Sequence, residues 1–414
     1  MKLQVKRVRF GDCAVLEGRR SRLIVDCGGS SQAPDGSLSA RDFAYAAIAA
    51  QVDDLLPTHI LISHLHPNHY RGFLALGENC PPLFRTGAQV GAAYLPWTLL
   101  GGRAALAPAF ARLYLAAPPR TLAHSLAREL LELLARLEEE AKELRPVQAG
   151  DVLPLDGQKL EVLWPRTETA LAKLPLAGGQ SFLEADGPME ALCRTALAGA
   201  PLGGELLEVG VKLEEALSAY FLLLHGEALA APARRGALSR LNDLRAQADQ
   251  LRHTLWGCEL HPPYPPWLRP LSAFAQRQAA LLEDALEACG VVLQWRDKAL
   301  LLGDTPAPVL ELLRSEGRFH PRYAVVKLPC HGTDRCHFPA IPPADRYILS
   351  NGGYRRYPVE GTVLEGLAQS SPDCAFLCTD AHLRPAEDCR YACREGRCHP
   401  ACVPITDAQA VIPL

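Results

Sequence analysis

The sequence predicts an α/β protein that is enlarged by helical insertions and ends in a cysteine-rich tail. Three observations lead to this fold class. Short alternating or wholly apolar segments, typical of β-strands, occur near the N-terminus and again after residue 290. Two long stretches between them repeat apolar residues every three or four positions, as amphipathic helices do. Cysteines cluster in the last part of the chain, from position 374 to position 402.

The first elements form a β-meander followed by a helix and a buried strand. Residues 3–26 alternate in polarity over three short strands, which are broken at Gly11-Asp12 and at Gly18-Arg19-Arg20. Residues 40–53 have a helical pattern. Residues 58–63 then form a short apolar segment, typical of a strand that is buried on both faces.

Two helical blocks interrupt the strand pattern. The first spans about 104–145 and ends before Pro146, and the second spans about 185–288 with a proline-rich break. Residues 147–165, between them, are predicted to be strand and turn. We therefore interpret both helical blocks as insertions into an α/β domain.

The strand pattern returns after the second block. Residues 291–303 are predicted to form a strand, a turn and a strand, followed by a short helix at 308–317. Further segments, in order, are strand 323–328, strand 346–353 with its turn, a helix near 363–369 and a last strand at 374–380.

Composition limits the class of protein. The chain has 414 residues, of which 48% are hydrophobic and 21% charged, so it can bury a large core and is neither collagen-like nor wholly disordered. The formal net charge of −3 gives no overall electrostatic reason to expect nucleic acid, although a local arginine patch stays possible. The sequence starts MKLQVKRVRF, without the apolar core of a signal peptide, and contains no apolar run long enough for a membrane helix. We expect a cytoplasmic protein with no membrane association.

Three histidines lie within six residues, directly after the apolar segment 58–63. His64 and His66 are two positions apart, so their imidazoles point the same way in extended chain, and the next turn can bring His69 back toward them. This spacing is typical of a metal site. The alternative is a loop whose histidines are ordinary surface polar groups.

The segment from His64 to His69 resembles the H-x-H-x-D-H signature of the metallo-β-lactamase fold, here with Asn68 in place of the aspartate. Further landmarks have an order similar to that in the lactamase-like domain of bacterial competence DNA-uptake channel proteins, over roughly 1–100, 146–166 and 291–380. The landmarks are the Gly11-Asp12 turn, the strand end Ile24-Val25-Asp26-Cys27-Gly28, Gly150-Asp151 through Leu163-Trp164-Pro165, Leu301-Leu302-Gly303-Asp304, Lys327-Leu328-Pro329-Cys330-His331-Gly332, Leu349-Ser350-Asn351-Gly352 and Thr379-Asp380.

The resemblance implies a four-layer αββα sandwich, here over residues 1–380, that holds one or two zinc ions, with manganese as the alternative. In such a site imidazoles and a carboxylate hold each ion, and a metal-bound hydroxide is the nucleophile. By resemblance, the first metal binds His64 and His66, the second binds His69 and His331, and Asp304 bridges them. Asp26 would orient the histidine loop through hydrogen bonds.

Two of these residues also have simpler explanations. Asp304 precedes a helix that starts near Pro306, where an aspartate often caps the first turn. Asp26 lies in the sequence Asp-Cys-Gly-Gly, which is typical of a turn.

The chain departs from the family pattern at three points. Asn68 is an uncharged and weaker ligand than aspartate and cannot take up a proton in the same way. Cys330 stands where the family has the first histidine of an H-H-G sequence, and it is either a thiolate ligand or a buried thiol. A further histidine that many relatives place before the bridging aspartate has no clear counterpart.

The tail, residues 381–414, contains a second cluster of potential ligands. Two cysteine pairs around a turn can form a closed tetrahedral zinc site in a segment too short for its own core. The alternatives are reduced thiols or disulfides, and His399 could replace one cysteine. The expected ligands are Cys389, Cys393, Cys398 and Cys402.

The sequence therefore predicts a metal-dependent hydrolase, with phosphodiesterase or nuclease as the first expectation and Asn68 and Asp304 as the catalytic candidates. Its partners would be a nucleic acid or another phosphodiester. The second hypothesis is a catalytically degenerate scaffold whose helical insertions bind a protein partner, which the three departures favour. Because one fold can support many activities, the substrate is not fixed by the resemblance.

Overall fold

The structure is a computed structural model, and it describes residues 1–29, 39–49, 56–75, 90–97, 110–111, 113–115, 117, 121–166, 202–224, 231–256, 268–351, 359–379, 402–404 and 409–414. The chain divides into two compact units. The first comprises Met1–Pro96, Glu140–Arg166 and Glu287–Leu414, and the second comprises Trp97–Glu139 and Thr167–Leu286.

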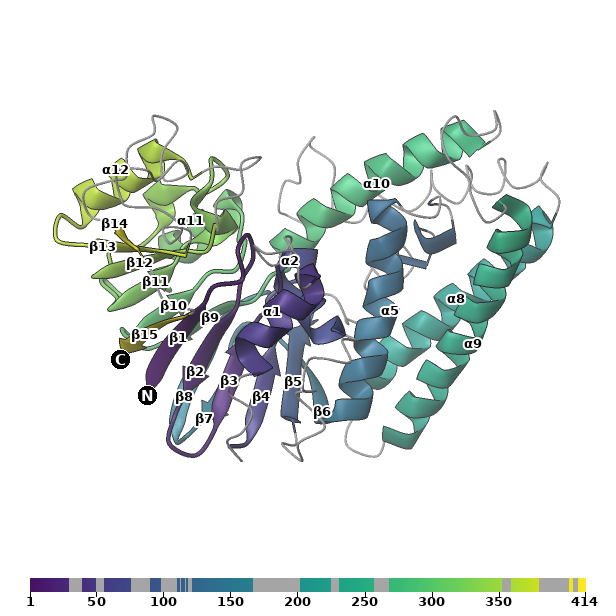
Figure 1. Ribbon diagram of the computed structural model, residues 1–414, viewed down its shortest axis with the longest axis horizontal. Helices are drawn as coiled ribbons and strands as arrows, with labels where there is room; N and C mark the ends of the chain where they lie inside the picture. The colour runs from purple at the N-terminus through teal and green to yellow at the C-terminus, as the bar shows by residue number, and fades with distance from the viewer. Residues whose placement is uncertain are drawn as a thin grey trace. The chain divides into compact units, whose positions relative to one another are not determined.

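The first unit contains a seven-stranded mixed sheet with the order β15-β1-β2-β3-β4-β5-β6 (Figure 1). The strands from β15 to β3 pair antiparallel, and the strands from β3 to β6 pair parallel. The strands are β1 (Lys2–Lys6), β2 (Ala14–Glu17), β3 (Arg22–Val25), β4 (Thr58–Leu61), β5 (Val90–Pro96), β6 (Ala141–Val147) and β15 (Gln409–Pro413).

The same unit contains an eight-stranded mixed sheet with the order β14-β13-β12-β11-β10-β9-β8-β7. Here the strands from β14 to β10 pair parallel and those from β10 to β7 pair antiparallel. The strands are β7 (Val152–Leu155), β8 (Gln158–Trp164), β9 (Val292–Trp295), β10 (Ala299–Leu301), β11 (Val325–Lys327), β12 (Arg346–Leu349), β13 (Ala375–Cys378) and β14 (Cys402–Pro404).

One hydrophobic cluster joins the two sheets. Alternate residues of the first sheet, such as Leu3, Val5 and Leu23, share this cluster with Leu160 and Leu293 of the second. The alternation follows from strand geometry, because successive side chains point to opposite faces. The molecule is thus an α/β structure with two mixed sheets around a shared core.

The carboxyl ends of the parallel strands carry the polar residues that the sequence singles out. Asp26 follows β3, His64 follows β4, Asp304 follows β10 and His331 follows β11. Because parallel strands end at one edge of a sheet, residues distant in sequence meet there.

Short helices complete the first unit. Helix α1 packs against η1, and both α11 and α12 contact η4. These elements are α1 (Ala40–Ala49), α2 (Pro67–Tyr70), η1 (Arg71–Leu74), α11 (Ala307–Ser315), η3 (Pro329–Gly332), η4 (Phe338–Ala340) and α12 (Gly361–Ser370).

The second unit is helical in its described residues. Its helices are α5 (Leu122–Glu140), α8 (Gly203–Leu224), α9 (Ala231–Trp256) and most of α10 (Leu268–Ala288), and α8 packs along α9. Glu138 of α5 accepts hydrogen bonds from Tyr220 of α8 and Arg234 of α9, at 3.3 and 3.0 Å. Glu138, whose side chain is 5% exposed, therefore links three helices. No helix among the described residues is both long and apolar enough to cross a membrane.

The structure confirms most of the predicted elements and corrects one of them. Residues 141–145 were predicted to continue the first helical block, but the helix ends at Glu140 and residues 141–147 form β6, paired with β5. The periodic leucines continue through Leu144, yet pairing with a neighbouring strand outweighs a local helical pattern. Strands β5, β14 and β15 were not predicted from the sequence.

A candidate metal centre

Three imidazole side chains surround the carboxylate of Asp304. Its Oδ2 atom is 3.2 Å from Nε2 of His69, 3.4 Å from Nε2 of His331 and 3.7 Å from Nε2 of His64. In a tetrahedral zinc site, with donors about 2.0–2.1 Å from the ion, donor atoms lie roughly 3.3–3.4 Å apart. The spacing around Asp304 is therefore that of a set of metal ligands.

Asp304 belongs to two groups of potential ligands. One consists of Asp304, His64 and His66, and the other of Asp304, Asp12, His69 and His331, and the ligand atoms of each group lie within 4.8 Å of one another. All of these residues are buried except His66, which is partly exposed.

Nε2 of His64 and Oδ1 of Asp12 are buried polar atoms with no hydrogen-bond partner among the described residues. A buried polar atom without a partner is costly unless a ligand or an ion satisfies it. The residues present therefore fit a metal ion, with His64 Nε2 as an available donor.

The Asp26 carboxylate positions the histidine loop through hydrogen bonds to Ser63 and His69. Its Oδ1 accepts a hydrogen bond from the amide of Ser63 at 2.7 Å, and its Oδ2 accepts one from the Ser63 hydroxyl at 2.6 Å. The same Oδ2 lies 2.9 Å from Nδ1 of His69. A carboxylate at Nδ1 keeps the proton on that atom and directs Nε2 toward the centre.

His331 is positioned by unusual backbone geometry. Cys330 and His331 have φ angles of 49° and 56°, a left-handed conformation that is uncommon for residues with side chains. This turn directs Nε2 of His331 toward Asp304, while its Nδ1 lies 3.1 Å from the carbonyl oxygen of Ser350. The Phe10 ring packs against the imidazole, with the ring centroids 4.4 Å apart.

His66 has an acidic neighbour that the sequence analysis did not identify. Its Nδ1 is 3.7 Å from Oε1 of Glu287, at the end of α10. Glu287 is buried and forms a two-contact ion pair with Arg335, one contact being 2.7 Å.

Backbone contacts fix the loop that carries these histidines. The amide of Asp12 donates to the carbonyl of Asn68 at 3.0 Å, and the amide of Cys27 donates to the carbonyl of His69 at 2.7 Å. A Cβ atom on Gly28 would lie 2.3 Å from the carbonyl carbon of Asn68, so only glycine permits this approach. The Gly-Asp and Asp-Cys-Gly landmarks of the sequence are the residues that hold the loop.

The structure shows how the departures from the family pattern are accommodated. The Asn68 side chain lies 2.8 Å from Nε2 of His331 through its amide nitrogen. The backbone amide of Cys330 donates to Oδ1 of Asp304 at 3.1 Å, and burial raises the pKa of its thiol well above the ordinary value. Among the described residues, no further histidine joins either ligand group.

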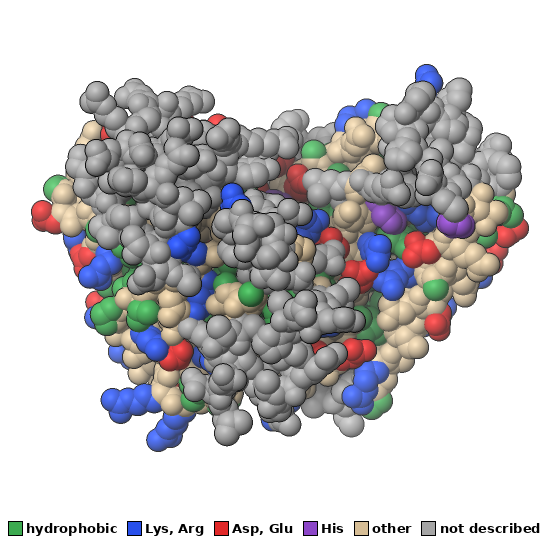
Figure 2. All heavy atoms as spheres, viewed as in Figure 1, with side chains coloured by type: hydrophobic (Ala, Val, Ile, Leu, Met, Phe, Trp, Pro, Cys, Tyr) green, Lys and Arg blue, Asp and Glu red, His purple; other side chains and the backbone are tan. Residues whose placement is uncertain are grey.

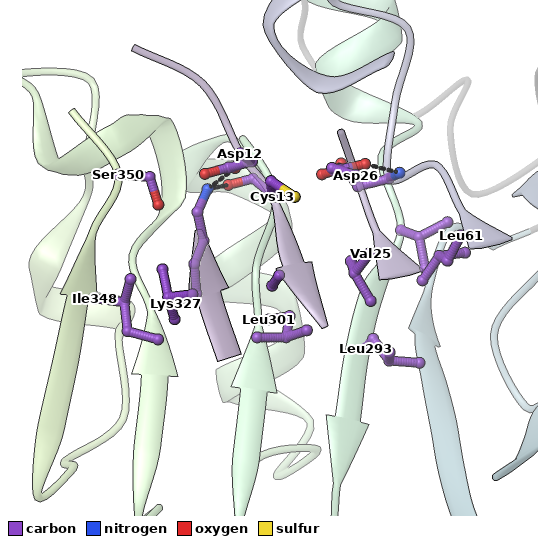
Figure 3. Close-up of a pocket in the computed structure, with 15 residues that line it drawn as sticks. Asp12, Cys13, Val25, Asp26, Leu61, Leu293, Leu301, Lys327, Ile348 and Ser350 are labelled. Atoms are coloured by element: carbon purple, nitrogen blue, oxygen red, sulfur yellow. Dashed lines mark hydrogen bonds and ion pairs between the residues drawn. The ribbon is translucent and has the colours of Figure 1, made fainter. Parts of the chain in front are cut away.

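Asp12 and Lys327 also belong to the site, although the sequence landmarks that contain them gave neither residue a role. Lys327 forms a buried ion pair with Asp12, and its Nζ lies 3.7 Å from Oδ1 of Asp304 and donates to the carbonyl of Gly303 at 3.0 Å (Figure 3). The positions of Asp12 and Lys327 inside the Gly-Asp and Lys-x-Pro motifs were the only sequence indication that the two residues have a role. Their contact could not be predicted from the sequence, because the two residues belong to the segments of different sheets.

A small cavity lies between the sheets below the site. Its volume of about 20 Å³ suffices for about one water molecule. Figure 3 shows the polar side chains of Asp12, Asp26, Lys327 and Ser350 at one end and apolar side chains such as Leu293 and Leu301 at the other. The polar centre thus rests directly on the hydrophobic core.

Opposed effects set the protonation of the centre. Burial alone would raise the pKa of the Asp304 carboxyl, but His331 and His69 outweigh it and hold that pKa well below its ordinary value. Burial would lower the pKa of His69, yet Asp304, Asp26 and Asp12 raise it to about 10. For His64, burial and the charges of His69 and His66 lower the pKa well below the ordinary value. His64 is therefore neutral, whereas His69 holds a proton that a metal ion must displace.

The structure brings together Asp26, His64, His66, His69, Asp304 and His331, with Asn68 beside His331. Asp304 does not cap α11, because the residue at that position is Pro306. Of the cysteines expected to bind a structural zinc, Cys389, Cys393 and Cys398 lie outside the described residues, and Cys402 begins β14.

The sequence model of the metallo-beta-lactamase superfamily matches residues 7–142. This segment is therefore similar to metallo-beta-lactamase superfamily proteins. No curated protein matches the chain.

The segment that matches the metallo-beta-lactamase superfamily model includes Asp12, Asp26 and the histidine loop. Asp304 and His331 lie beyond residue 142, on the second sheet. The candidate centre therefore combines the matched segment with strands that follow it by more than a hundred residues in the chain.

Proposed function

We propose that the protein is a metal-dependent hydrolase of phosphodiesters. The observation that carries this proposal is the convergence of three imidazole Nε2 atoms on Oδ2 of Asp304, at 3.2 to 3.7 Å. Ligand sets of this kind in metallo-beta-lactamase superfamily proteins typically bind divalent ions. Zinc is the first candidate and manganese the second, because imidazole and carboxylate suit both.

A divalent ion would be held by His64, His66 and Asp304, with His69 and His331 as the ligands on the other side of the carboxylate. The chemistry that such an ion supplies is activation of water and polarisation of the scissile phosphoryl or acyl group.

The chain's own residues orient this ligand set. Cys330 N–H holds Oδ1 of Asp304, which leaves Oδ2 to face the histidines. Asp26 keeps a proton on Nδ1 of His69, and the Ser350 carbonyl does so for His331, so that each ring presents Nε2. The Asn68 amide, which cannot accept a proton as a carboxylate can, donates to His331.

We propose a phosphodiester substrate because the landmarks are similar to those of the competence DNA-uptake proteins, and we propose that the chain is related to them. The surface charge favours neither a nucleic acid nor another substrate. On the face shown in Figure 2, Lys and Arg side chains lie among Asp and Glu, and the net charge is −3. A short nucleic acid or another small phosphodiester therefore fits better than a long duplex, which basic surfaces usually bind.

The proposal includes a four-layer fold and a structural zinc in the tail. The four-layer αββα arrangement agrees with two mixed sheets that share one core. A structural zinc held by the tail cysteines agrees with their paired spacing in the sequence.

The second candidate is a catalytically degenerate scaffold that binds a protein partner through its helical unit. It is favoured by Asn68 in place of a carboxylate and by the buried, protonated thiol of Cys330.

Metal analysis combined with a hydrolysis assay separates these candidates. We expect purified protein to bind zinc or manganese and to hydrolyse a bis-aryl phosphodiester. The double variant His64→Ala/His66→Ala should lose hydrolysis and the metal bound at the histidines, while zinc held by the tail cysteines remains. The control is His253→Ala, an exposed histidine on α9, which should behave as wild type. Hydrolysis that survives in the double variant would refute the proposed mechanism, and metal binding without any hydrolysis would favour the scaffold.

A further inference from the structure

An ion pair lies beside the ligand group of His64, His66 and Asp304. Both terminal nitrogens of Arg335 hydrogen-bond to the Glu287 carboxylate, Nη1 with Oε1 at 2.7 Å and Nη2 with Oε2. The planar guanidinium matches the two carboxylate oxygens, so this pairing fixes the orientation of the arginine. The glutamate side chain is 4% exposed, whereas the arginine side chain is 51% exposed. Glu287 therefore anchors Arg335 from the protein interior.

This ion pair borders the one ligand that is not buried. Nδ1 of His66 is 3.7 Å from Oε1 of Glu287, the oxygen that also accepts from Nη1 of Arg335. Among the residues of the two ligand groups, His66 alone is partly exposed. The backbone joins the two segments, because the amide of Val291 donates to the carbonyl of Ser63 at 2.8 Å. A substrate therefore reaches the centre on the side of His66, where Arg335 lies.

A second cation, Lys327, lies too deep to contact a substrate. It is 6% exposed, and its ammonium group pairs with Asp12 and donates to the Gly303 carbonyl at 3.0 Å. Figure 3 shows its nitrogen directed at the Asp12 carboxylate. Arg335, in contrast, is half exposed, and a guanidinium carries five N–H donors in a plane that suits phosphate oxygens.

The chemistry of a phosphodiester requires a cation at this position. Its phosphoryl group is anionic and would approach the carboxylates of Asp304 and Glu287, which repel it. Hydrolysis places further negative charge on the phosphoryl oxygens, and a donor that is already in place stabilises this charge. The contacts with Glu287 hold Arg335 before the substrate binds, which reduces the entropy lost on binding.

We infer that Arg335 contacts the anionic phosphoryl group of the substrate and that Glu287 holds it in position. This inference rests on the proposed function and adds the residue that recognises the charge of the substrate. Arg335 is thus a substrate-binding residue, and Glu287 is a positioning residue that acts through it.

The test is the steady-state kinetics of the full-length, zinc-loaded protein on a bis-aryl phosphodiester. We expect Arg335→Met to lower kcat/KM by roughly 10- to 100-fold, mainly through KM, because a charge-assisted hydrogen bond is lost. Arg335→Lys should recover part of this loss, because it keeps the charge. The matched control is Arg322→Met. Arg322 is 49% exposed and paired with Asp345, but it precedes β11, whereas His331 follows that strand. This control should keep the wild-type KM.

Glu287→Gln tests the positioning role. It should raise KM as well, and Glu287→Gln/Arg335→Met should raise KM no further than Arg335→Met does, because Glu287 acts through the arginine. The double variant leaves neither member of the pair charged, so it avoids the buried, uncompensated carboxylate that could unfold Arg335→Met. Independent effects that multiply in the double variant would overturn the positioning role.

The remaining results separate the inference from the proposed function. A wild-type KM in folded Arg335→Met, or in the double variant, would overturn the inference and leave the proposed function intact. An Arg335→Lys protein no better than Arg335→Met would show that charge does not matter at this position, contrary to the inference. Wild-type protein that binds zinc at the histidines but does not hydrolyse the phosphodiester would overturn both. Circular dichroism, and zinc content above that of His64→Ala, establish that each variant is folded with its centre intact.

Discussion

Nε2 of His69 lies 3.2 Å from Oδ2 of Asp304, although the two residues are 235 positions apart in the chain. The imidazole comes from the loop after β4 in one sheet, and the carboxylate follows β10 in the other. The contact therefore exists only when both sheets share their core, and it links the stability of the fold to the candidate metal centre.

Replacing Asp304 with asparagine should abolish metal binding at the centre. The amide keeps the size of the side chain but removes the negative charge that faces three imidazoles, so we expect metal affinity and hydrolysis to fall by about 100-fold or more. Metal content after dialysis and the rate on a bis-aryl phosphodiester measure this effect. The control is Asp297→Asn, an exposed turn position, which should leave both unchanged. Full metal content in Asp304→Asn would contradict the assignment.

Replacing Asp26 with asparagine should weaken metal binding without destroying the fold. Asp26 has a φ of 60°, which asparagine tolerates, but the amide cannot accept hydrogen bonds from both Ser63 and His69 as the carboxylate does. We expect metal affinity to fall roughly 10- to 100-fold, as for other residues that orient metal ligands. Competition with a chelator measures this change. An unchanged affinity would mean that Asp26 only shapes its turn.

Metal affinity should increase with pH between about 7 and 10. The pKa of His69 is raised to about 10 in the metal-free protein, so an incoming ion must displace a proton throughout this range. Calorimetric titration in buffers of different ionisation enthalpy should show proton release on binding, and less of it as pH approaches 10. Equal proton release at pH 7 and pH 10 would rule out His69 as the group that titrates.

The same pKa sets the stability of the metal-free protein. Because the folded-state pKa of His69 is above its ordinary value of 6.5, its contribution is complete below pH 6.5 and is lost as pH rises through 10. We expect the free energy of unfolding of the metal-free protein to fall across this window, and to fall less in His69→Gln. Urea denaturation at several pH values tests this, and identical slopes in both proteins would refute it.

Replacing Gly28 with alanine should displace the histidine loop. The new Cβ would lie 2.3 Å from the Asn68 carbonyl carbon and 2.4 Å from the His69 amide nitrogen, both of which are backbone atoms that cannot easily move. We expect a lower melting temperature and reduced metal binding. Gly204→Ala, where a Cβ meets no atom within 4 Å, is the matched control and should keep both properties. Wild-type metal binding in Gly28→Ala would show that the loop adapts.

Local patterns predicted the elements that depend on local interactions. The three N-terminal strands, the buried strand before the histidines and the second helical block, in which α8, α9 and α10 lie, were identified from periodicity. The end of α5 was not, because Ala141 and Leu144 continue the helical repeat but lie in β6, the edge strand beside β5. An edge strand also tolerates Pro146, which was interpreted as a helix terminator. Strand pairing is a contact with a distant segment, and periodicity does not record it.

The residue types available for metal chemistry could be identified from their motifs: the histidines at 64, 66 and 69, the aspartates at 26 and 304, and His331. Folding is what places Asp12 and Lys327 in the same centre and turns Asn68 toward His331. Ligand identity is a property of single side chains, whereas the charge balance of a buried site depends on every group that folding brings within a few ångströms, including groups from the opposite sheet.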